Sequence, residues 1–544
     1  MNARFAVPMP VNEPILGYAP GSPERAKLFA RLHEMKARQA DVPLFIGGEE
    51  MRTGKKIELR SPHDHVQILG KAHIGGPAEV RKAINAALKA RKEWSRMPFP
   101  ARAAIFLKAA ELLAGDWRWT LNAATMLCQS KNVHQAEIDS ACELIDFLRF
   151  NAYYAERIYG EQPLSPRGTW NRLEYRALEG FILAVTPFNF TAIAGNLPTA
   201  PALMGNTVVW KPATSALYTA HFLMRLLDEA GLPPGVINMV AGPAAALTDG
   251  ALAHPDLAGV HFTGSTGVFQ SMWKTIGVNI ANYKSYPRLV GETGGKDFVL
   301  VHASADPDAV AAALVRGAFE YQGQKCSAAS RAYIPESLWP RTRKAMKAMI
   351  AEIEVGSPED PGNYVNAVID RRAFDSIKRH IDAAKKTKGN KVVFGGTCDD
   401  SKGFFIAPTV ILSADPQSPT MREEIFGPVL TVHVYPDGQW KRTLALVDRT
   451  SPYALTGAVF ARERRAILEA ERALEHAAGN FYVNDKPTGA VVGQQPFGGA
   501  RASGTNDKAG SYLNLIRWVS PRAVKENFDP PRDFRYPWLA RDGA

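Results

Sequence analysis

Cys326 has the sequence surroundings of a reactive thiol. It lies between a helix-like run over residues 309–321 and an apolar, strand-like segment over residues 332–334, so we expect it at a helix-to-strand joint that a ligand can reach. Lys325 and the neighbouring backbone N–H groups should favour the thiolate, which is the reactive form. A lone cysteine is more often a buried structural residue, and a nucleophile needs a partner base.

Two further residues could complete such a site. Glu292 precedes a pair of glycines, and a carboxylate among glycine and apolar residues is poorly solvated, so its pKa should rise towards the range of a general base. Asn189 lies between two phenylalanines, and its side-chain amide could donate to an oxyanion. Taken alone, Glu292 could instead be a surface loop residue and Asn189 a turn residue.

These segments resemble the aldehyde dehydrogenase superfamily over roughly residues 40–525. Five motifs occur in the family's order: Pro-Phe-Asn-Phe at 187–190, Phe-Thr-Gly-Ser at 262–265, Gly-Glu-Thr-Gly-Gly-Lys at 291–296, Gly-Gln-Lys-Cys at 323–326 and Glu-Glu-Ile-Phe-Gly-Pro at 423–428. The resemblance implies an α/β fold with a Rossmann-type NAD-binding domain, a second α/β catalytic domain and a small oligomerisation flap. It also implies NAD-dependent aldehyde oxidation with Cys326 as nucleophile, Glu292 as base and Asn189 as oxyanion donor.

The region from residue 181 onwards predicts a cofactor-binding sheet. Short apolar runs at 181–185, 207–210, 236–240 and 260–263 alternate with helical patterns, which indicates βαβ units with a cofactor at the carboxyl ends of parallel strands. Residues 264–268 follow such a strand and precede a helix, so their N–H groups could meet a pyrophosphate. The resemblance implies these cofactor-binding residues: Thr186, Lys211, Gly264, Ser265, Thr266, Gly267, Val268, Glu424 and Phe426. Thr214 stands where the family often has a glutamate, which leaves the preference for NAD over NADP less firm.

Shorter segments resemble the branch of this superfamily that oxidises L-glutamate γ-semialdehyde, the open form of delta-1-pyrroline-5-carboxylate, to L-glutamate in the second step of proline catabolism. They are residues 188–193, 319–321, 493–499 and 503–508. The resemblance implies four substrate-binding residues: Ser327, Gly489, Ala490 and Phe497. Backbone N–H groups of a glycine-containing loop can bind a carboxylate. Glu143 is a candidate for binding the substrate's amino group, with a solvated helix-surface glutamate as the alternative.

Other functions stay open at this point. They are the oxidation of another carboxylate-bearing semialdehyde, non-redox thiol ester hydrolysis or acyl transfer, and a catalytically silent binding or structural role. The formation of NADH from NAD and an aldehyde would separate the first from the others, because only hydride transfer reduces the nicotinamide.

The motifs suggest a division of the chain into four parts. We expect an N-terminal arm at 1–40, an NAD-binding domain at 41–159 and 181–293, a catalytic domain at 294–510, and an oligomerisation flap with its tail at 160–180 and 511–544. The catalytic domain should contain strands at 298–301, 391–394, 429–435, 456–460 and 481–484. Residues 160–180 predict a polar hairpin, which needs a partner to be stable. By resemblance this flap joins a homodimer or higher homo-oligomer, and a proline dehydrogenase is a further candidate partner.

Composition limits the other classes of function. With 544 residues and 46% hydrophobic content, the chain suits two or three domains. We expect no membrane partner, because no apolar run approaches the ~20 residues of a membrane span, and no nucleic-acid partner, because the net charge of +11 comes without a recognition motif. The four cysteines lack metal-ligand spacing, so we expect no metal site. The N-terminal residues lack a secretion or transit pattern, so the expected compartment is the cytoplasm, with the mitochondrial matrix as the alternative.

Overall fold

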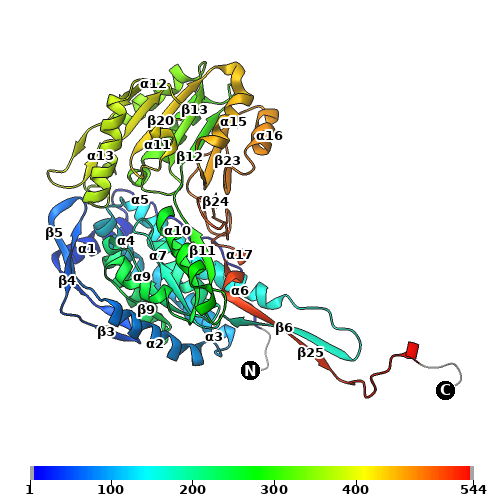
Figure 1. Cartoon of the computed structure of the whole chain (residues 1–544). Coiled ribbons are helices and arrows are strands. Elements are labelled where there is room, and N and C mark those ends of the chain that lie inside the picture. Colours follow the sequence, from blue (N-terminus) through cyan, green and yellow to red (C-terminus); the bar gives the residue numbers. More distant parts are fainter. Residues whose placement is uncertain (1–4, 540–544) are drawn as a thin grey trace.

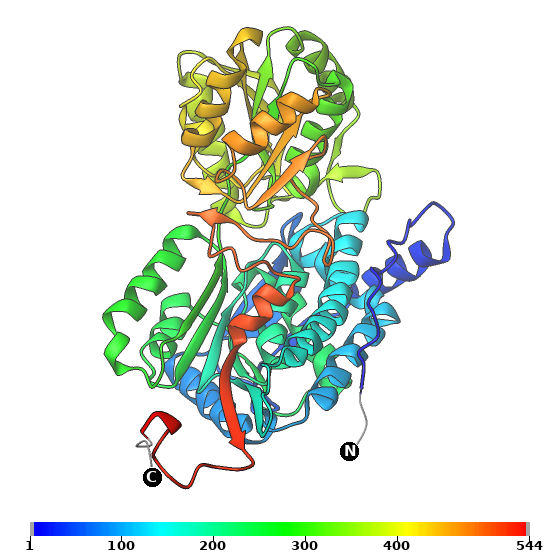
Figure 2. The ribbon, with the colours of Figure 1, turned by 90° about the vertical axis from the view of Figure 1, so that its right-hand side faces the viewer.

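Two α/β units and a projecting two-stranded ribbon make up the chain in this computed structural model (Figures 1 and 2). The structure describes residues 5–539. Each unit contains one seven-stranded sheet, and in Figure 1 the unit in blue to green lies below the unit in green to orange. The predicted α/β fold class is confirmed. In residues 5–539 no helix is both long and apolar enough to cross a membrane.

The first sheet has the strand order β11-β10-β7-β8-β9-β2-β3. Its strands are β2 (Leu44–Ile46), β3 (Glu49–Met51), β7 (Phe181–Val185), β8 (Thr207–Lys211), β9 (Ile237–Met239), β10 (Leu257–Thr263) and β11 (Arg288–Glu292). β11, β10, β7, β8 and β9 run parallel, as the sequence predicted. Alternate residues of β7 enter two separate hydrophobic cores, Ile182 and Ala184 one core and Phe181, Leu183 and Val185 the other. This sheet is therefore buried on both faces, as parallel sheets are.

Helices surround this sheet. They are α2 (Pro77–Trp94), α3 (Phe99–Ala114), α4 (Trp117–Gln129), α6 (Leu144–Gly160), α7 (Thr191–Leu203), α8 (Leu217–Ala230), α9 (Ala244–Leu252) and α10 (Thr266–Val278). A small sheet of β1 (Ala40–Val42), β5 (Asp64–His73) and β4 (Lys56–Ser61) lies at the side of the same unit.

The second sheet has the order β16-β19-β20-β13-β12-β22-β23, parallel except for β16. Its strands are β12 (Asp297–Val301), β13 (Ala329–Pro335), β16 (Asn390–Phe394), β19 (Thr409–Ser413), β20 (Val429–Tyr435), β22 (Thr456–Phe460) and β23 (Asn480–Val483). The helices of this unit include α11 (Pro307–Phe319), α12 (Trp339–Ala351), α13 (Arg371–Lys386), α15 (Trp440–Thr450) and α16 (Arg464–Ala473). α11 begins where Asp306 accepts the N–H groups of Asp308 and Ala309, which satisfies donors at the helix start.

The helical pattern over residues 135–159 predicts one helix, and the structure divides it. α5 (Val133–Ala136) passes into a π-helix, η1 (Glu137–Glu143), and then into α6. A π-helix inserts extra residues into a turn without changing which residues are apolar, so a 3.6-residue pattern cannot reveal it. Such segments occur often at functional sites. This one carries the buried carboxylates Glu137 and Asp139.

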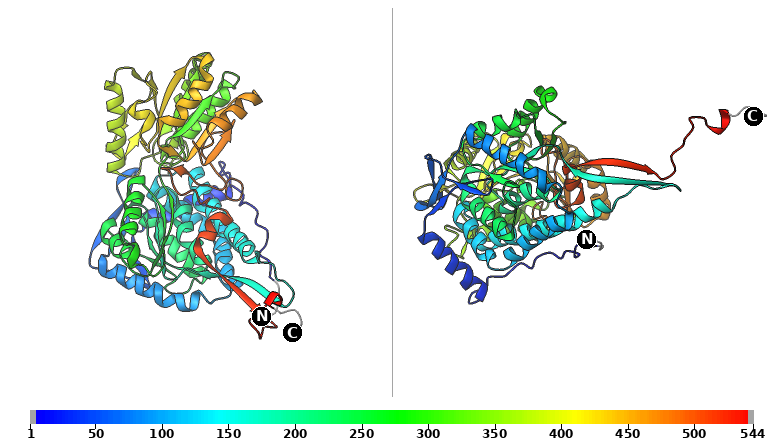
Figure 3. Two further views of the ribbon diagram at one scale, coloured as in Figure 1. Left: turned by 45° about the vertical axis from the view of Figure 1, so that its right-hand side comes forward. Right: turned by 90° about the horizontal axis from the view of Figure 1, so that it is seen from below.

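The ribbon that projects from the lower unit corrects the predicted hairpin within residues 160–180. Here β6 (Thr169–Ala177) pairs antiparallel with β25 (Val519–Asn527), from the far end of the chain. Figure 3 shows the two strands extending together away from the body. The alternating pattern of the segment predicted a strand correctly, and the tail that the resemblance joined to this flap supplies its partner, more than 300 residues away and beyond the reach of a local turn signal.

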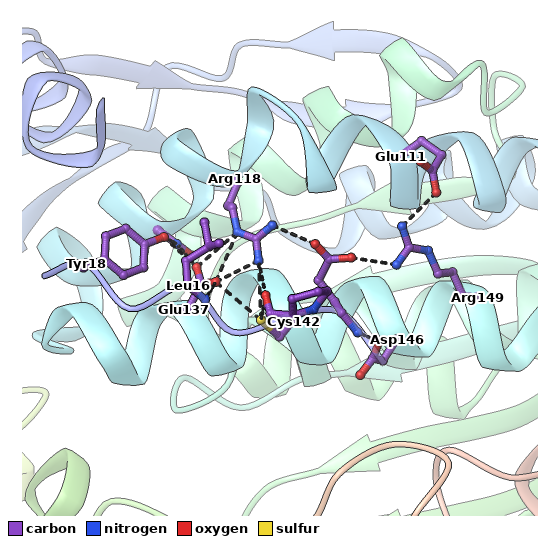
Figure 4. Close-up of polar contacts among 11 residues, drawn as sticks. Leu16, Tyr18, Glu111, Arg118, Glu137, Cys142, Asp146 and Arg149 are labelled. Atoms are coloured by element: carbon purple, nitrogen blue, oxygen red, sulfur yellow. Dashed lines mark hydrogen bonds and ion pairs between the residues drawn. The ribbon is translucent and has the colours of Figure 1, made fainter. Parts of the chain in front are cut away.

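The N-terminal arm is attached to the first unit by buried charges. α1 (Pro23–Ala37) begins after Ser22, whose side chain accepts the N–H of Arg25. Upstream, the guanidinium of Arg118 contacts Glu13 at 2.8 Å and Glu137 at 2.7 Å, and Tyr18 donates to Glu137 at 2.6 Å. Figure 4 shows Arg118 and Glu137 at the centre of this network, which we call the arm network.

Replacing Arg118 with methionine should destabilise the fold strongly. The substitution keeps most of the side-chain volume but leaves the buried Glu137 carboxylate without its cation, and breaking a buried pair in this way costs about 3–5 kcal/mol. Urea unfolding followed by tryptophan fluorescence would measure the change. A midpoint equal to that of the unmodified protein would show that the arm network contributes little.

Candidate active site

The loop that carries Cys326 is held by close backbone contacts between elements. It runs from η4 (Glu320–Gly323), directly after α11, to β13, so Cys326 lies at the expected helix-to-strand joint. Tyr321 and Gln322 have positive φ angles of 50° and 54°, which non-glycine residues adopt rarely. At Gly323, also with positive φ, a side chain would lie 2.2 Å from the carbonyl oxygen of Gly427. Only glycine allows this approach.

The electrostatics of the thiol differ from the expectation. Burial raises the pKa of Cys326 well above its ordinary value, and the neighbouring carboxyl groups of Asp297, Glu292 and Glu424 raise it further. The Lys325 ammonium does not offset this, because it is paired with Glu320 at 3.1 Å. The expectation that Lys325 favours the thiolate is therefore wrong for this arrangement: its charge is neutralised by a carboxylate that precedes the loop.

Glu292 ends β11 and is poorly solvated, as predicted. Burial raises its pKa well above the ordinary value, against the opposing effect of a hydrogen bond from the N–H of Gly499 at 3.1 Å. At the preceding residue, Gly291, a side chain would overlap the ring of Phe269, 2.2 Å away. Phe269 stacks on Phe262 with ring centroids 5.4 Å apart. The strand end that carries Glu292 is thus packed beneath two aromatic rings.

Asn189 lies beside the nucleophile loop. Its side-chain amide donates to the carbonyl oxygen of Gln324 at 3.0 Å, two residues before Cys326. An asparagine amide has two N–H groups, so one fixes the side chain while the second stays available for an oxyanion. The structure therefore brings Cys326, Glu292 and Asn189 to one place, although only Glu292 and Cys326 are close enough to affect each other's titration.

The expected cofactor residues lie along the carboxyl edge of the first sheet. Thr186 and Lys211 are at the ends of the neighbouring strands β7 and β8, in register, and Thr186 accepts the indole N–H of Trp210 at 2.9 Å. Residues 264–268 connect β10 to the start of α10, where the N-cap Ser265 makes no side-chain capping bond. The backbone N–H groups at this helix start can therefore receive an anion.

Glu424 and Phe426 come from the second unit. A Glu424 carboxylate oxygen accepts the N–H of Gly295 at 2.9 Å, and burial raises the pKa of Glu424 to about 7. A side chain at Gly294 would lie 2.3 Å from the same carboxylate. Phe426 packs edge-on against Phe188, with centroids 5.9 Å apart, so these expected cofactor residues contact the segments that carry Glu292 and Asn189.

The expected substrate residues divide into a connected set and a separate one. Ser327 shares a hydrogen bond of 2.8 Å with Thr488, which precedes Gly489 and Ala490, so the nucleophile loop is tied to the substrate loop. Phe497 exchanges two backbone hydrogen bonds with Ala509, which fixes the far end of that loop.

Glu143 lies in the π-helix, away from this loop in the sequence. Burial raises its pKa to about 8, and the nearby Asp139 adds to the rise. The raised pKa does not fit a fully solvated helix-surface glutamate, and Glu143 is partly exposed at the end of η1.

Sequence reasoning missed three buried charged residues near this site: Lys131, Asp139 and Asp297. Burial raises the pKa of Asp297 to about 8, and an Asp297 oxygen accepts the N–H of Thr456 at 2.7 Å. Lys131 and Asp139 are separated by eight residues and form a buried pair. Asp297 begins β12, Lys131 follows α4 and Asp139 lies in the π-helix, so no common spacing in the sequence singles them out. In residues 5–539 no group of three potential metal ligands is present.

Alkylation of Cys326 should be slow near neutral pH and accelerate as pH rises, because the thiol stays protonated until pH approaches its raised pKa. Iodoacetamide labelling across a pH series, with peptide mapping to separate Cys326 from Cys398, would measure it. In Glu292→Gln the midpoint should shift down, because one neighbouring carboxyl is removed. A rate that is already at its plateau near neutral pH would contradict the burial argument.

Comparisons with known proteins agree over nearly the whole chain. The model of the aldehyde dehydrogenase family matches residues 50–519. Delta-1-pyrroline-5-carboxylate dehydrogenase of Agaricus bisporus is 54% identical, covering 98% of this chain and 98% of that protein, and the mitochondrial protein of that name from Bos taurus is 49% identical, covering 97% and 94%. The crystal structure of delta-pyrroline-5-carboxylate dehydrogenase from Mycobacterium tuberculosis bound with NAD has a TM-score of 0.96 and 54% identity, covering 99% of this chain and 100% of that chain. This chain belongs to the aldehyde dehydrogenase family.

Proposed function

We propose that this protein oxidises L-glutamate γ-semialdehyde, in equilibrium with delta-1-pyrroline-5-carboxylate, to L-glutamate with NAD as hydride acceptor. The observation that supports the proposal is that the Glu292 carboxyl lies near enough to raise the pKa of Cys326 while the Asn189 amide is hydrogen-bonded to the loop that carries Cys326. The chain is about half identical to proteins named for this reaction. The buried carboxylate beside a thiol suits a thioester cycle, in which one group attacks and the other activates water.

The residues at the carboxyl edge of the first sheet fit a dinucleotide. The uncapped helix start at residues 264–268 suits the pyrophosphate, while Thr186 and Lys211 would lie along the adenosine half and Glu424 with Phe426 would hold the nicotinamide ribose. When bound, NAD supplies the hydride acceptor. Thr214 is exposed and offers no carboxylate to ribose hydroxyls, so this position supplies no negative charge against the 2′-phosphate of NADP.

The protein's own groups then have the following roles. Cys326 loses its proton to solvent and, as the thiolate, attacks the aldehyde carbon; the resulting oxyanion accepts hydrogen bonds from the Asn189 amide and the Cys326 backbone N–H. Loss of hydride from that carbon leaves a thioester on Cys326. Glu292 accepts a proton from water, which attacks the thioester, releases the carboxylate product and restores the thiol.

Substrate choice would depend on the loop around Gly489. Gly489 has a φ angle of 96°, and in such a turn consecutive N–H groups can converge on a carboxylate. Ala490 has no hydroxyl where some members have serine, so only its N–H would contribute. Ser327, tied to Thr488, would bring this loop next to the thiol, and Glu143 would face the substrate's amino group.

Further assembly and location are proposed on the resemblance. The ribbon of β6 and β25 would pair with a second copy in a homodimer or higher homo-oligomer, and a proline dehydrogenase would supply the substrate. The compartment would be the cytoplasm or, as for the Bos taurus relative whose name includes mitochondrial, the mitochondrial matrix.

Glu292→Gln should show a rapid burst of about one NADH per active site followed by slow turnover, because thioester formation does not need the base and hydrolysis does. Stopped-flow absorbance of NADH would measure it. The control Cys326→Ala should give no burst while still binding NAD. A uniformly slowed first turnover in Glu292→Gln would assign water activation to another group.

A panel of aldehydes of graded length, with and without the α-carboxylate, should show the highest kcat/KM for the γ-semialdehyde that bears it. Removing the carboxylate leaves loop N–H groups unpaired, and a site built to bind such a group rejects an analogue that lacks it by up to about 10⁴. Equal kcat/KM for the carboxylate-free aldehyde would refute this substrate assignment while leaving aldehyde oxidation intact.

A further inference from the structure

Lys131 is a buried cation that lies between the two chain segments of the active site. It follows α4, with a side chain 1% exposed. Its ammonium lies 4.2 Å from the ring centre of Phe190, next to Asn189, and 4.4 Å from the ring centre of Tyr321, in the loop before Cys326. Both distances are within the range of a cation–π contact. One charge therefore contacts both the segment that carries Asn189 and Phe190, which we call the oxyanion segment, and the segment from Tyr321 to Cys326, which we call the nucleophile segment.

The partner of Lys131 fixes the oxyanion segment a second time. The ammonium contacts Asp139 of the π-helix at 2.6 Å. The Asp139 carboxylate in turn accepts the N–H groups of Thr191 at 3.0 Å and of Ala192 at 2.8 Å, which are the first two residues of α7. A carboxylate at this place satisfies free N–H groups of the helix start. α7 begins two residues after Asn189, so Asp139 sets where that asparagine lies.

The nucleophile segment is bound to the same turn. Gln322, next to Tyr321, donates its side-chain amide to the carbonyl oxygens of Ser130 at 2.9 Å and of Ala367 at 2.8 Å. Ser130 directly precedes Lys131. The backbone of the turn at residues 130–131 therefore contacts the loop that carries Cys326. The Lys131 side chain of the same turn contacts both the oxyanion segment and the nucleophile segment.

We propose that Lys131, paired with Asp139, is a positioning residue that holds the Asn189 amide against the Cys326 loop at the place where the oxyanion develops. The inference rests on the proposed roles of Cys326 and Asn189 and extends them to a residue that contacts neither reacting group. A shift of the amide by about 1 Å is enough to lower the rate by about 10²-fold, since donors act on the oxyanion only over hydrogen-bond distances.

The first test is Lys131→Met, which keeps the length of the side chain and removes its charge. kcat for aldehyde oxidation should fall on the order of 10-fold to 100-fold, with little change in KM for either substrate. Arg118→Met is the matched control, because it also removes a buried cation paired with a π-helix carboxylate but lies in the arm network. It should lower the urea midpoint comparably and leave kcat unchanged.

A double-mutant cycle with Asn189→Ala separates positioning from general damage to the fold. If Lys131 acts through Asn189, Lys131→Met should have no further effect on kcat once Asn189 is alanine, because coupled residues are not additive. An undiminished loss in that background would overturn the proposal. So would an unchanged kcat in Lys131→Met alone.

Two further measurements keep the proposal testable on other grounds. If Lys131→Met does not fold, Phe190→Leu removes one ring contact, leaves the ion pair with Asp139 in place, and should lower kcat in the same direction.

Hydrolysis of p-nitrophenyl acetate uses the thiol and the oxyanion donor without NAD. If the unmodified protein made no NADH from the aldehyde, the proposed oxidation would be refuted. The role of Lys131 would still be supported if ester hydrolysis were lost in Lys131→Met and kept in Arg118→Met. Unchanged ester hydrolysis in Lys131→Met would overturn that role.

Discussion

The arrangement of this protein depends on the removal of water from a group of carboxyls around one thiol. Asp297, Glu292 and Glu424 come from different strands and loops of both units, and burial raises the pKa of each. Each approaches Cys326 closely enough to raise its pKa as well. Isolated buried charges are costly, so these carboxyl groups lose their protons at higher pH than ordinary carboxyl groups do.

Glycines make this dense packing possible, which explains their place in the motifs. Side chains at Gly291, Gly294 and Gly323 would overlap the Phe269 ring, the Glu424 carboxylate and the Gly427 backbone respectively. Each overlap would separate two of the segments that build the site. Glycines flank Glu292 and precede Cys326 because other atoms lie within contact distance of the backbone there. This close packing explains why the motifs contain glycine at these positions.

Much of the architecture was accessible from sequence because its signals are local. The strands at Phe181–Val185 and Thr456–Phe460 are short apolar runs between helical patterns, and both are present in parallel sheets as predicted. The placement of Glu292 in a dry site also followed from its glycine and apolar neighbours.

The failures have a different cause, because each depends on a strand pairing or a backbone turn that a local sequence pattern does not encode. The ribbon strand β6 pairs with β25, which no turn signal connects to it. Lys325 is neutralised by Glu320, although both lie in the same segment, because the left-handed turn at Tyr321 and Gln322 brings them together. A sequence pattern assumes ordinary helix or strand geometry, and the chain leaves that geometry both at the π-helix and at this turn.

Those two departures are next to each other in space, and the Lys131 turn joins them. Left-handed backbone at Tyr321 and Gln322 costs about 1–3 kcal/mol per residue and persists only where the surroundings impose it. The Gln322 side chain donates to the carbonyl oxygen of Ser130 in the turn at residues 130–131 and to that of Ala367, and the Tyr321 ring contacts the Lys131 ammonium. A buried ion pair contributes little net stability against a well-packed apolar substitute. At this position the ion pair of Lys131 and Asp139 instead fixes geometry. It holds the turn at Tyr321 and Gln322 and the start of α7 at a fixed distance from each other, next to the proposed site of the aldehyde.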